Sequence, residues 1–304
     1  MARTPKRESS ITLVGAGNLA SALGPALKAA GYGIDAVVSR SFPKSKRRAA
    51  ALAGKLDARV VALEDLQPVS DIIWLCHTDD ALAQTARALA RKKGWQGRIV
   101  LHSSGALTSD VLTPLHRAGA YTASLHPMMT FVPGTTPEME KVPFAVEGHR
   151  LAVATAKRIV KALKAEVFAI RKEAKVLYHA LGSFSSPMIL ATLVTAERVG
   201  KAAGLSHKQV AKTMTRILLQ TIVNYVQRGP SAAFSGPIKR GDLNTVRRHL
   251  QELQRVPGAL NVYSALVKSA LMDLPSENKD GILQILSLSR AKRGNPTVKK
   301  NSKV

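Results

Sequence analysis

The feature that most constrains the fold of this chain is a glycine-rich turn close to its start. The apolar run 11–14 breaks into Gly15-Ala16-Gly17-Asn18-Leu19-Ala20, a Gly-x-Gly-x-x-Ala pattern that opens a helical segment over 19–30. The first glycine allows a tight turn, the second leaves room for a diphosphate, and the small third residue lets the helix pack on the strand. The first amides of that helix favour phosphate. The pattern predicts a dinucleotide site, with a purely structural turn as the alternative.

The residues after the second expected strand, 34–38, indicate which dinucleotide binds. That strand ends in Ser39-Arg40-Ser41, and basic residues follow through position 48. A site selective for NAD usually places Asp or Glu here to hold the ribose 2′-hydroxyl, and this strand tip has neither. An arginine between two hydroxyls suits a 2′-phosphate instead. We therefore expect NADP(H), the alternative being a solvated basic loop.

Length and composition favour a two-domain globular protein. The chain has 304 residues, of which 45% are hydrophobic, and no apolar stretch approaches the roughly 20 residues that span a bilayer. The basic N-terminus lacks an apolar segment of the kind found in signal peptides. The single cysteine, Cys76, stands in an apolar run and is expected to be structural. These features predict a cytoplasmic protein without a membrane span.

The charge of the chain is strongly positive, at +25, with a pI near 10.6. Such a charge attracts polyanions. The basic residues are spread along the chain, however, and aromatic residues make up only 4%. No zinc spacing, RNA-recognition motif or convincing helix-turn-helix accompanies them. We expect a general surface bias that helps to recruit an anionic cofactor, without specific nucleic-acid binding, and a disordered basic tail over 291–304.

The hydrophobic pattern changes near the middle of the chain. The first half alternates strands and helices at the spacing of a doubly wound parallel sheet. Further strands are expected over 58–62, 71–76, 98–102, 120–125, 143–147 and 166–170, and helices over 44–54, 81–92, 108–118 and 151–163. The second half shows helical periodicity over 173–184, 187–203, 207–228, 242–254, 257–272 and 279–289, broken by Gly and Pro. The fold class is therefore α/β, with a Rossmann-type domain over 8–172 and an all-α domain over 173–290.

Polar residues follow two expected strands at the edge where a cofactor would lie. One strand ends in Cys76-His77-Thr78 and the next in His102-Ser103-Ser104-Gly105. The carboxyl ends of parallel strands border the ligand crevice. The residues expected to contact the cofactor are Gly15, Ala16, Gly17, Asn18, Leu19, Ser39, Arg40, Ser41, His77, Thr78, Ser103 and Ser104. Gly105 is expected beside the substrate, although this turn has the alternative of being shaped only by its glycine.

Two histidines are candidates for proton transfer. His126 stands in Leu125-His126-Pro127 at the end of an apolar strand, where an imidazole can donate a proton to a reduced carbonyl or imine. His179 lies on the first helix of the second half and is expected to face the same cleft. For each of them a structural hydrogen-bonding role is the alternative. Together with His102 they match no compact metal-ligand spacing, so no metal is expected.

Substrate contacts are expected from the helical half as well. Ser186 offers a hydroxyl at a helix junction, with capping of the helix at Pro187 as its alternative role. Lys239 and Arg240, in the segment Gly236-Pro-Ile-Lys-Arg-Gly-Asp242, are expected to bind an anionic substrate or cofactor phosphates. The alternative for both is solvated charge. Asp242 is expected to cap the next helix.

Several segments, taken in order, resemble one family. They are GAGNLA at 15–20, Ser39-Arg40-Ser41, HSSGAL at 102–107, SLHPMMTF at 124–131, LYHALGSFSSP at 177–187 and GPIKRGD at 236–242. Over about residues 9–272 the chain resembles Rossmann-like oxidoreductases whose C-terminal half is a domain of unknown function. That family is related to pyrroline-5-carboxylate reductase and to the 6-phosphogluconate dehydrogenase superfamily.

The resemblance implies an NADP-binding domain, a helical domain that often dimerises, and a small-molecule substrate in the cleft between them. The chain departs from relatives at two places. Pro187 stands where many relatives carry Asn, and Lys175 is followed by His179 where hydroxyacid dehydrogenases have a Lys-x-x-x-Asn pair. The leading hypothesis is an NADP(H)-dependent reductase of a small, anionic carbonyl or imine compound. The alternative is a sensor or scaffold that binds NADP(H) without turnover.

Overall fold

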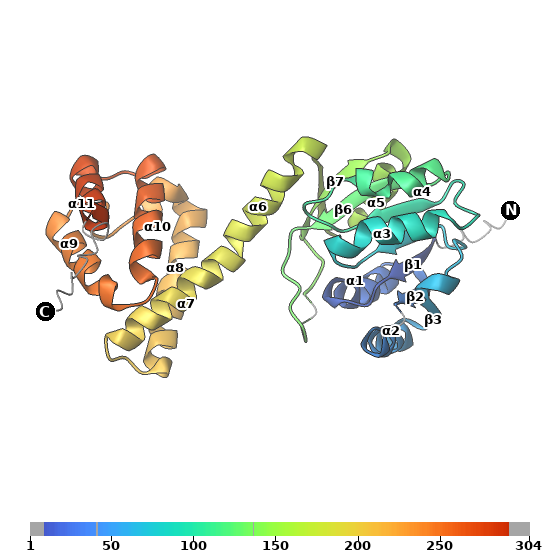
Figure 1. Ribbon diagram of the computed structural model, residues 1–304, viewed down its shortest axis with the longest axis horizontal. Helices are drawn as coiled ribbons and strands as arrows, with labels where there is room; N and C mark the ends of the chain where they lie inside the picture. The colour runs from blue at the N-terminus through green and yellow to red at the C-terminus, as the bar shows by residue number, and fades with distance from the viewer. Residues whose placement is uncertain (1–8, 41, 136, 292–304) are drawn as a thin grey trace, which may run out of the picture. The chain divides into compact units, whose positions relative to one another are not determined.

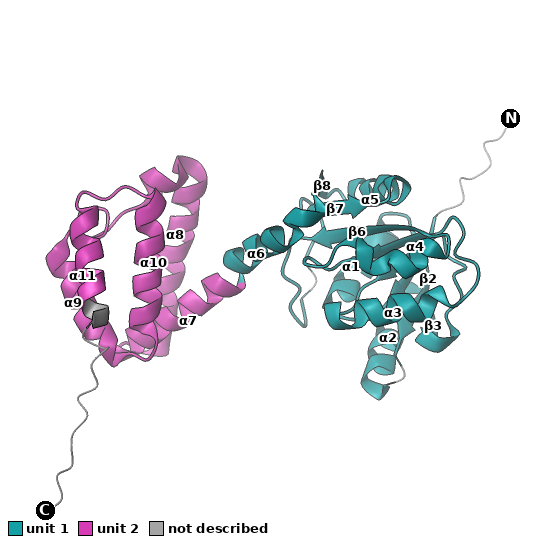
Figure 2. Ribbon diagram, turned by 45° about the horizontal axis from the view of Figure 1, so that its top comes forward, with its two compact units in different colours: residues 1–186 teal, residues 187–304 magenta. Residues whose placement is uncertain are grey.

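The computed structural model describes residues 9–40, 42–135 and 137–291 of the chain. They divide into two units, one ending at Ser186 and one beginning at Pro187 (Figure 2). The expected basic tail lies outside the described residues beyond Ala291.

The first unit is built on an eight-stranded sheet in the order β3-β2-β1-β4-β5-β6-β7-β8. Its strands are β1 (Ser10–Val14), β2 (Gly33–Ser39), β3 (Arg59–Ala62), β4 (Ile72–Leu75), β5 (Ile99–His102), β6 (Tyr121–Pro127), β7 (Pro143–Gly148) and β8 (Glu166–Ala169). Every neighbouring pair is parallel except β6 and β7, which are antiparallel. The Rossmann-type α/β prediction is confirmed. Only β7 and β8 run opposite to the other strands, because a loop without a crossover helix joins β6 to β7.

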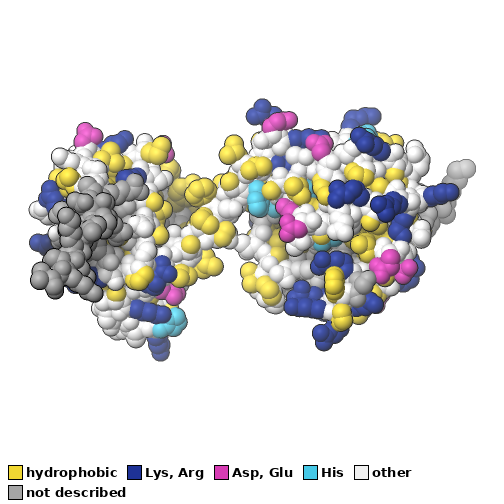
Figure 3. All heavy atoms as spheres, viewed as in Figure 1, with side chains coloured by type: hydrophobic (Ala, Val, Ile, Leu, Met, Phe, Trp, Pro, Cys, Tyr) yellow, Lys and Arg dark blue, Asp and Glu magenta, His cyan; other side chains and the backbone are white. Residues whose placement is uncertain are grey.

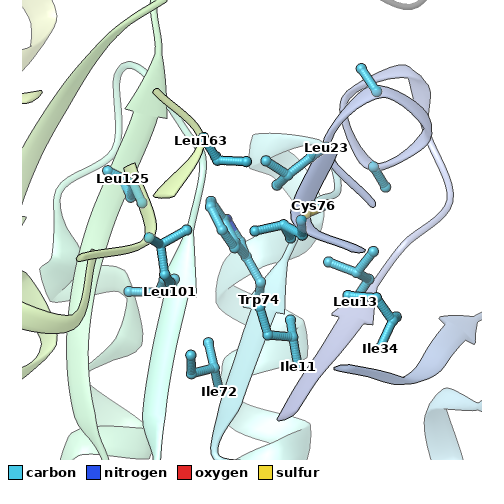
Figure 4. Packing of buried hydrophobic residues seen from close by; sticks show 14 of the residues in the cluster. Ile11, Leu13, Leu23, Ile34, Ile72, Trp74, Cys76, Leu101, Leu125 and Leu163 are labelled. Carbon is cyan, nitrogen blue, oxygen red and sulfur yellow. The ribbon is translucent and has the colours of Figure 1, made fainter. Parts of the chain in front are cut away.

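Helices cover both faces of this sheet (Figure 1). They are α1 (Asn18–Ala29), α2 (Pro43–Leu56), α3 (Asp79–Ala90), α4 (Thr113–Arg117) and α5 (Arg150–Ala162). One core joins the sheet to α1, α2 and α5, and a second joins it to α3 and α4. In β4, Ile72 and Trp74 enter the first core while Ile73 and Leu75 enter the second. This two-sided burial explains the unbroken apolar run of β4, and Figure 4 shows Trp74 within the first core.

Two elements differ from the sequence expectation. The segment 108–118 begins as a 3-10 turn, η2 (Ser109–Leu112), before α4. Pro114 lies in the first turn of α4, where its missing N–H breaks no helical bond. The helix α6 (Lys175–Ser185) falls in the sheet unit, although the sequence places the helical domain from 173 onward. It does so because its side chains Lys175 and Tyr178 are buried there.

The second unit is entirely helical in its described part. It contains α7 (Pro187–Ala202), α8 (His207–Ala233), α9 (Leu243–Glu252), α10 (Ala259–Asp273) and α11 (Lys279–Ala291). Its core consists of Ile238, Val246, Leu250, Leu260, Val267, Leu271, Ile282, Ile285 and Leu286. The expected cap is present, since Asp242 Oδ1 accepts from the Thr245 amide at 3.0 Å. Helix α8 is interrupted at Gly229, whose φ is 75°, and resumes through Pro230.

One helical run, Lys172–Ala202, is long and apolar enough to cross a membrane by length and composition alone. The sequence expectation was that no apolar stretch reaches that length. The difference arises because the run combines α6 and α7, which meet at Ser186, and polar residues separate its apolar stretches. Lys175, near its start, is buried and hydrogen-bonded within the sheet unit.

Candidate functional site

A pocket of about 520 Å³ lies at the carboxyl edge of the sheet. The tips of β1, β2, β4 and β5 meet there, as the doubly wound topology requires. Its lining includes ten of the twelve residues expected at a cofactor, namely Gly15, Ala16, Gly17, Asn18, Leu19, Ser39, Arg40, His77, Thr78 and Ser103. Ser41 lies outside the described residues, and Ser104 lies outside the pocket.

The turn after β1 has a conformation that favours glycine. Gly15 has a φ of 109°, and a Cβ there would lie 3.1 Å from the carbonyl oxygen of Cys76. Helix α1 follows with neither a side-chain cap nor an acidic residue in its first turn. Its first amides therefore remain available to an anion at the pocket. The Asn18 side chain donates to the Phe131 carbonyl at 3.0 Å, which ties the start of α1 to the loop after β6.

Cations gather where β2 meets α2. Arg40, Lys44 and Arg48 all line the pocket, and no Asp or Glu of the described chain does. The Arg40 amide donates to Ser45 Oγ at 3.1 Å, which shapes the loop. Its guanidinium lies 5.7 Å from the ring centre of Phe42. This end of the pocket is suited to a phosphate group.

His77 is half-buried and His102 is buried, and both have shielded ring nitrogens with unused hydrogen-bonding capacity. Neither ring nitrogen of His77, which lines the pocket, has a partner among the described residues. His102 accepts from the Ser104 amide through Nδ1 at 3.1 Å, and its Nε2 has no partner. Burial lowers the pKa of both rings, that of His102 to about 3 with the charge of Lys175 contributing. Because unpaired buried polar atoms cost free energy, the ring nitrogens of His77 leave an unmet demand for a hydrogen-bond partner beside the pocket.

The turn after β5 connects this pocket to a second group of side chains. Ser103 lines the pocket and its Oγ accepts from Trp74 Nε1 at 2.8 Å. The Ser104 hydroxyl instead accepts the amides of Ala106 and Leu107, at 3.2 and 2.8 Å. The Ser104 side chain is therefore used to shape the turn and is not presented to the pocket, unlike the sequence expectation for it.

Both histidines expected to transfer protons lie against Gly105. A Cβ on Gly105 would lie 2.8 Å from His126 Nε2 and 2.5 Å from His179 Cδ2. The rings of His126 and His179 are 6.0 Å apart, edge to face. His126 Nδ1 lies 3.1 Å from the hydroxyl oxygen of Tyr178. The structure thus brings together Gly105, His126 and His179, and adds Tyr178, which the sequence analysis did not select.

The ionisation of this group is unusual for histidine. Burial, followed by the charges of Lys175 and His179, lowers the pKa of His126 to about 4. Burial raises the pKa of Tyr178 to about 12. At neutral pH both groups are therefore uncharged. A proton donated at this site would come from a neutral imidazole or a neutral phenol, and not from an imidazolium ion.

A buried ion pair behind the turn was missed by the sequence analysis. Lys175 and Glu147 are 1% and 6% exposed, with Nζ 3.8 Å from Oε1. Burial lowers the pKa of Lys175 to about 8, against the opposing charges of Glu147 and Asp79. One signal was available, since Glu147 stands in an otherwise apolar strand and charged side chains are rarely buried without a partner.

Three further site expectations fall elsewhere. Ser186 lies at the junction of α6 and α7, half-buried. Lys239 and Arg240 lie in the second unit, half-buried and exposed respectively, without an ion pair among the described residues. Their role toward a substrate stays a prediction. The described residues contain no group of three His, Cys, Asp or Glu placed to hold a metal ion.

Two family models match the chain. The model described as a Rossmann-like domain matches residues 3–127, and the domain of unknown function DUF2520 matches residues 142–270. None of the curated proteins matches.

Solved structures share the fold over most of the chain. A protein of Bacteroides fragilis assigned as an NADP oxidoreductase is 24% identical, with a TM-score of 0.73 over 86% of this chain and 97% of that one. Protein TM1727 of Thermotoga maritima is 21% identical, with a TM-score of 0.66 over 92% and 99%. An imine reductase of Myxococcus stipitatus, in complex with NADP⁺, is 16% identical, with a TM-score of 0.64 over 91% and 99%. At these identities the likeness shows the fold.

Mild acid is expected to destabilise the sheet unit. The pKa of His102 is about 3 in the folded chain and about 6.5 in an unfolded one. At a pH between these two pKa values, unfolding is therefore accompanied by uptake of a proton. The contribution of neutral His102 to the free energy of unfolding is fully present above pH 6.5 and falls below it, by up to about 1.4 kcal/mol per pH unit. Urea unfolding followed by fluorescence of Trp74 and Trp95, both in this unit, measures the slope.

The substitution His102→Leu should flatten that slope between pH 6.5 and 5, with pH 8 as the common reference. An identical slope in the variant and the wild type would contradict the burial of a neutral imidazole at this position.

Proposed function

Because this chain belongs to the family that joins a Rossmann-like domain to the DUF2520 domain, we propose that it is an NADP(H)-dependent oxidoreductase of a small carbonyl or imine compound. The carrying observation is the pocket at the carboxyl edge of the sheet, which combines a glycine turn, an uncapped helix start and three cations. The proteins of the same fold named NADP oxidoreductase and imine reductase support the assignment. Lys239 and Arg240 would hold an anionic group of the substrate.

The residues of the pocket fit the proposed cofactor. The amides at the start of α1 would hold its diphosphate, and Arg40, Lys44 and Arg48 would hold the 2′-phosphate. His77, whose ring nitrogens lack partners, would bond to a polar group of the dinucleotide. When bound, NADPH supplies the hydride, and the protein supplies binding, orientation and electrostatics.

The pair of His126 and Tyr178 is suited to handle the proton. When Tyr178 donates to Nδ1, Nε2 carries hydrogen and can donate toward Gly105. When Nδ1 donates to Tyr178, Nε2 is an acceptor instead. The same pair therefore serves reduction in one arrangement and oxidation in the other.

The weak acidity of these groups favours a C=N over a C=O substrate. Hydride addition to a carbonyl leaves an alkoxide, which must take a proton from the enzyme. An iminium ion already carries its proton, and hydride addition gives a neutral amine directly. With the pKa of His126 near 4 and that of Tyr178 near 12, this site holds weak acids at neutral pH. We therefore infer an imine substrate, and carbonyl reduction is the slower case.

Removal of the Arg40 guanidinium should weaken NADPH more than NADH. A hydrogen bond to a charged group contributes about 1.5–3 kcal/mol, so Arg40→Ala should lower NADPH affinity roughly 10–100-fold and leave NADH binding nearly unchanged. Calorimetric titration of NADPH, NADP⁺ and NADH measures this. Arg150→Ala, an exposed arginine outside the pocket lining, is the matched control. Failure of every dinucleotide to bind would refute the oxidoreductase.

Loss of the imidazole at position 126 should slow turnover without loss of cofactor. General acid–base groups contribute about 10²–10⁴-fold where they supply the proton, so His126→Asn should lower kcat by that factor for keto acids and ketones and by less for iminium substrates, and Tyr178→Phe should have a smaller effect. NADPH consumption across cyclic imines, keto acids and ketones measures this, together with NADPH affinity. Binding of NADPH without consumption of any of these substrates would instead favour the sensor or scaffold.

We also propose that the chain forms a homodimer through its helical unit. Helices α7 and α8 expose large apolar side chains, namely Met188, Ile189, Leu190, Val194, Ile217, Leu219, Ile222, Val223, Tyr225 and Val226. Charged residues such as Lys212 and Arg216 share α8 with them, an amphipathic pattern that suits a protein partner better than a bilayer. Figure 3 shows hydrophobic side chains along α7.

A charge in this apolar surface should dissociate the dimer. Val226 is 75% exposed, so Val226→Glu should leave the unit folded and shift the chain from dimer to monomer in sedimentation velocity. Leu288→Glu, on α11, is the control for an exposed apolar position outside the surface and should remain dimeric. The proposal would be overturned if the wild-type chain were a monomer at all concentrations. It would also be overturned if the wild-type chain sedimented together with lipid vesicles.

A further inference from the structure

The buried ammonium of Lys175 occupies an unusual position behind the candidate site. It is the first residue of α6, and its Nζ donates to the Ser104 carbonyl at 3.0 Å and to the hydroxyl of Ser124. Glu147 lies 3.8 Å away on β7. Lys175 is 1% exposed, so a substrate cannot reach it. The lysine is therefore placed to act on other parts of the protein.

The partner of this lysine is itself held in place. Both carboxylate oxygens of Glu147 accept from Ser109, one from its amide and one from its hydroxyl, each at 2.7 Å. The cluster thus joins α6, β6, β7, η2 and the turn after β5. Burial of a charge pair is costly unless its remaining hydrogen bonds are satisfied, and here they are. The arrangement fixes the Ser104 carbonyl from one side.

The opposite side of the same turn faces the imidazoles. Gly105 follows the fixed carbonyl directly, and the space for a side chain on its Cα is taken by the rings of His126 and His179. A small displacement of the turn would therefore change how closely Gly105 approaches His126 Nε2. Through the Ser104 carbonyl, Lys175 thus sets the position of Gly105 beside the two imidazole rings.

We propose that Lys175 is a positioning residue for this site: its buried ammonium holds the Ser104–Gly105 turn against His126 and His179 and acts electrostatically on His126. The catalytic consequence of this inference rests on the proposed oxidoreductase function. The structural part stands on the hydrogen bonds alone.

The charges around His126 support the electrostatic part. The groups that face it are Tyr178, His179 and Lys175 from α6, and His102 from β5. After burial, the Lys175 charge is the largest influence that lowers the pKa of His126 and of His102. Loss of the ammonium should therefore raise the pKa of both imidazoles. The pKa of Lys175 near 8 means that the ammonium itself deprotonates in mildly alkaline solution.

The test is a histidine titration by NMR of the full chain with labelled imidazole carbons. In Lys175→Met the pKa of His126 should rise by on the order of one pH unit, and the Gly105 amide resonance should move. Lys172→Met is the matched control. Lys172 lies on the turn just before α6 and makes an exposed ion pair with Asp110. It should change neither quantity. A folded Lys175→Met in which His126 titrates as in the wild type would overturn the proposal.

Two further measurements cover a variant that does not fold. Lys175→Met/Glu147→Gln leaves no unpaired charge and keeps the bonds to Ser109, and it should raise the pKa of His126 equally. In the wild type, the His126 and Gly105 resonances should shift together as pH rises through about 8. Resonances of His126 and Gly105 that stay fixed while the Lys175 ammonium deprotonates, as followed by its own side-chain resonance, would refute the proposal without any substitution.

NADPH binding separates this inference from the proposed function. The variants should bind NADPH as the wild type does, because Lys175 lies outside the pocket lining. If imine turnover exists, kcat should fall in Lys175→Met with KM little changed. If the wild type binds no NADPH, the oxidoreductase proposal fails, whereas the titration still decides whether Lys175 controls His126.

Discussion

The first unit depends on how closely the turn after β1 approaches the tip of β4. Gly15 takes a φ of 109°, its amide donates to the Val38 carbonyl at 2.9 Å, and the Cys76 carbonyl occupies the space of a side chain. This packing draws the tips of β1, β2 and β4 to one point and aims the first amides of α1 at the space between them. The pocket follows from that convergence. A substituent on Gly15 would strain the backbone and separate the strands that supply the remaining lining.

A second constraint is the reversal of direction between β6 and β7. Because β7 returns antiparallel, Ser124 pairs with Glu147 in the strand register, and the start of α6 comes back over both. The charge of Lys175 is buried at that meeting point. An apolar replacement of similar volume is often no less stable than a buried ion pair, so stability alone gives little reason to keep one. Its value here lies in fixing the turn after β5 with a directional bond to a backbone carbonyl.

The sequence predicted the elements well because their periods are strong. The strand pattern of β4 and the helical patterns of the second unit are close to what the structure shows, and strand ends correctly identified the lining residues His77 and Ser103. The direction of β7 was not predicted, because the apolar pattern of a strand does not indicate the direction in which the strand runs. The pairing of Lys175 with Glu147 was missed because it depends on how the start of α6 packs against β7, which a local pattern does not contain. The neutrality of His126 follows from burial, which a local pattern does not contain.

The two constraints together restrict the chemistry that this edge of the sheet can perform. The pocket supplies positive charge where phosphates would lie, whereas the groups around Gly105 are an uncharged imidazole and an uncharged phenol. A positive charge exists nearby on Lys175, but it is 1% exposed and bonded to the backbone, so it lowers the basicity of its neighbours without donating to a substrate. Such a site orients a reactant and does little to protonate it. A substrate that arrives already protonated, as an iminium ion does, makes the least demand on these residues.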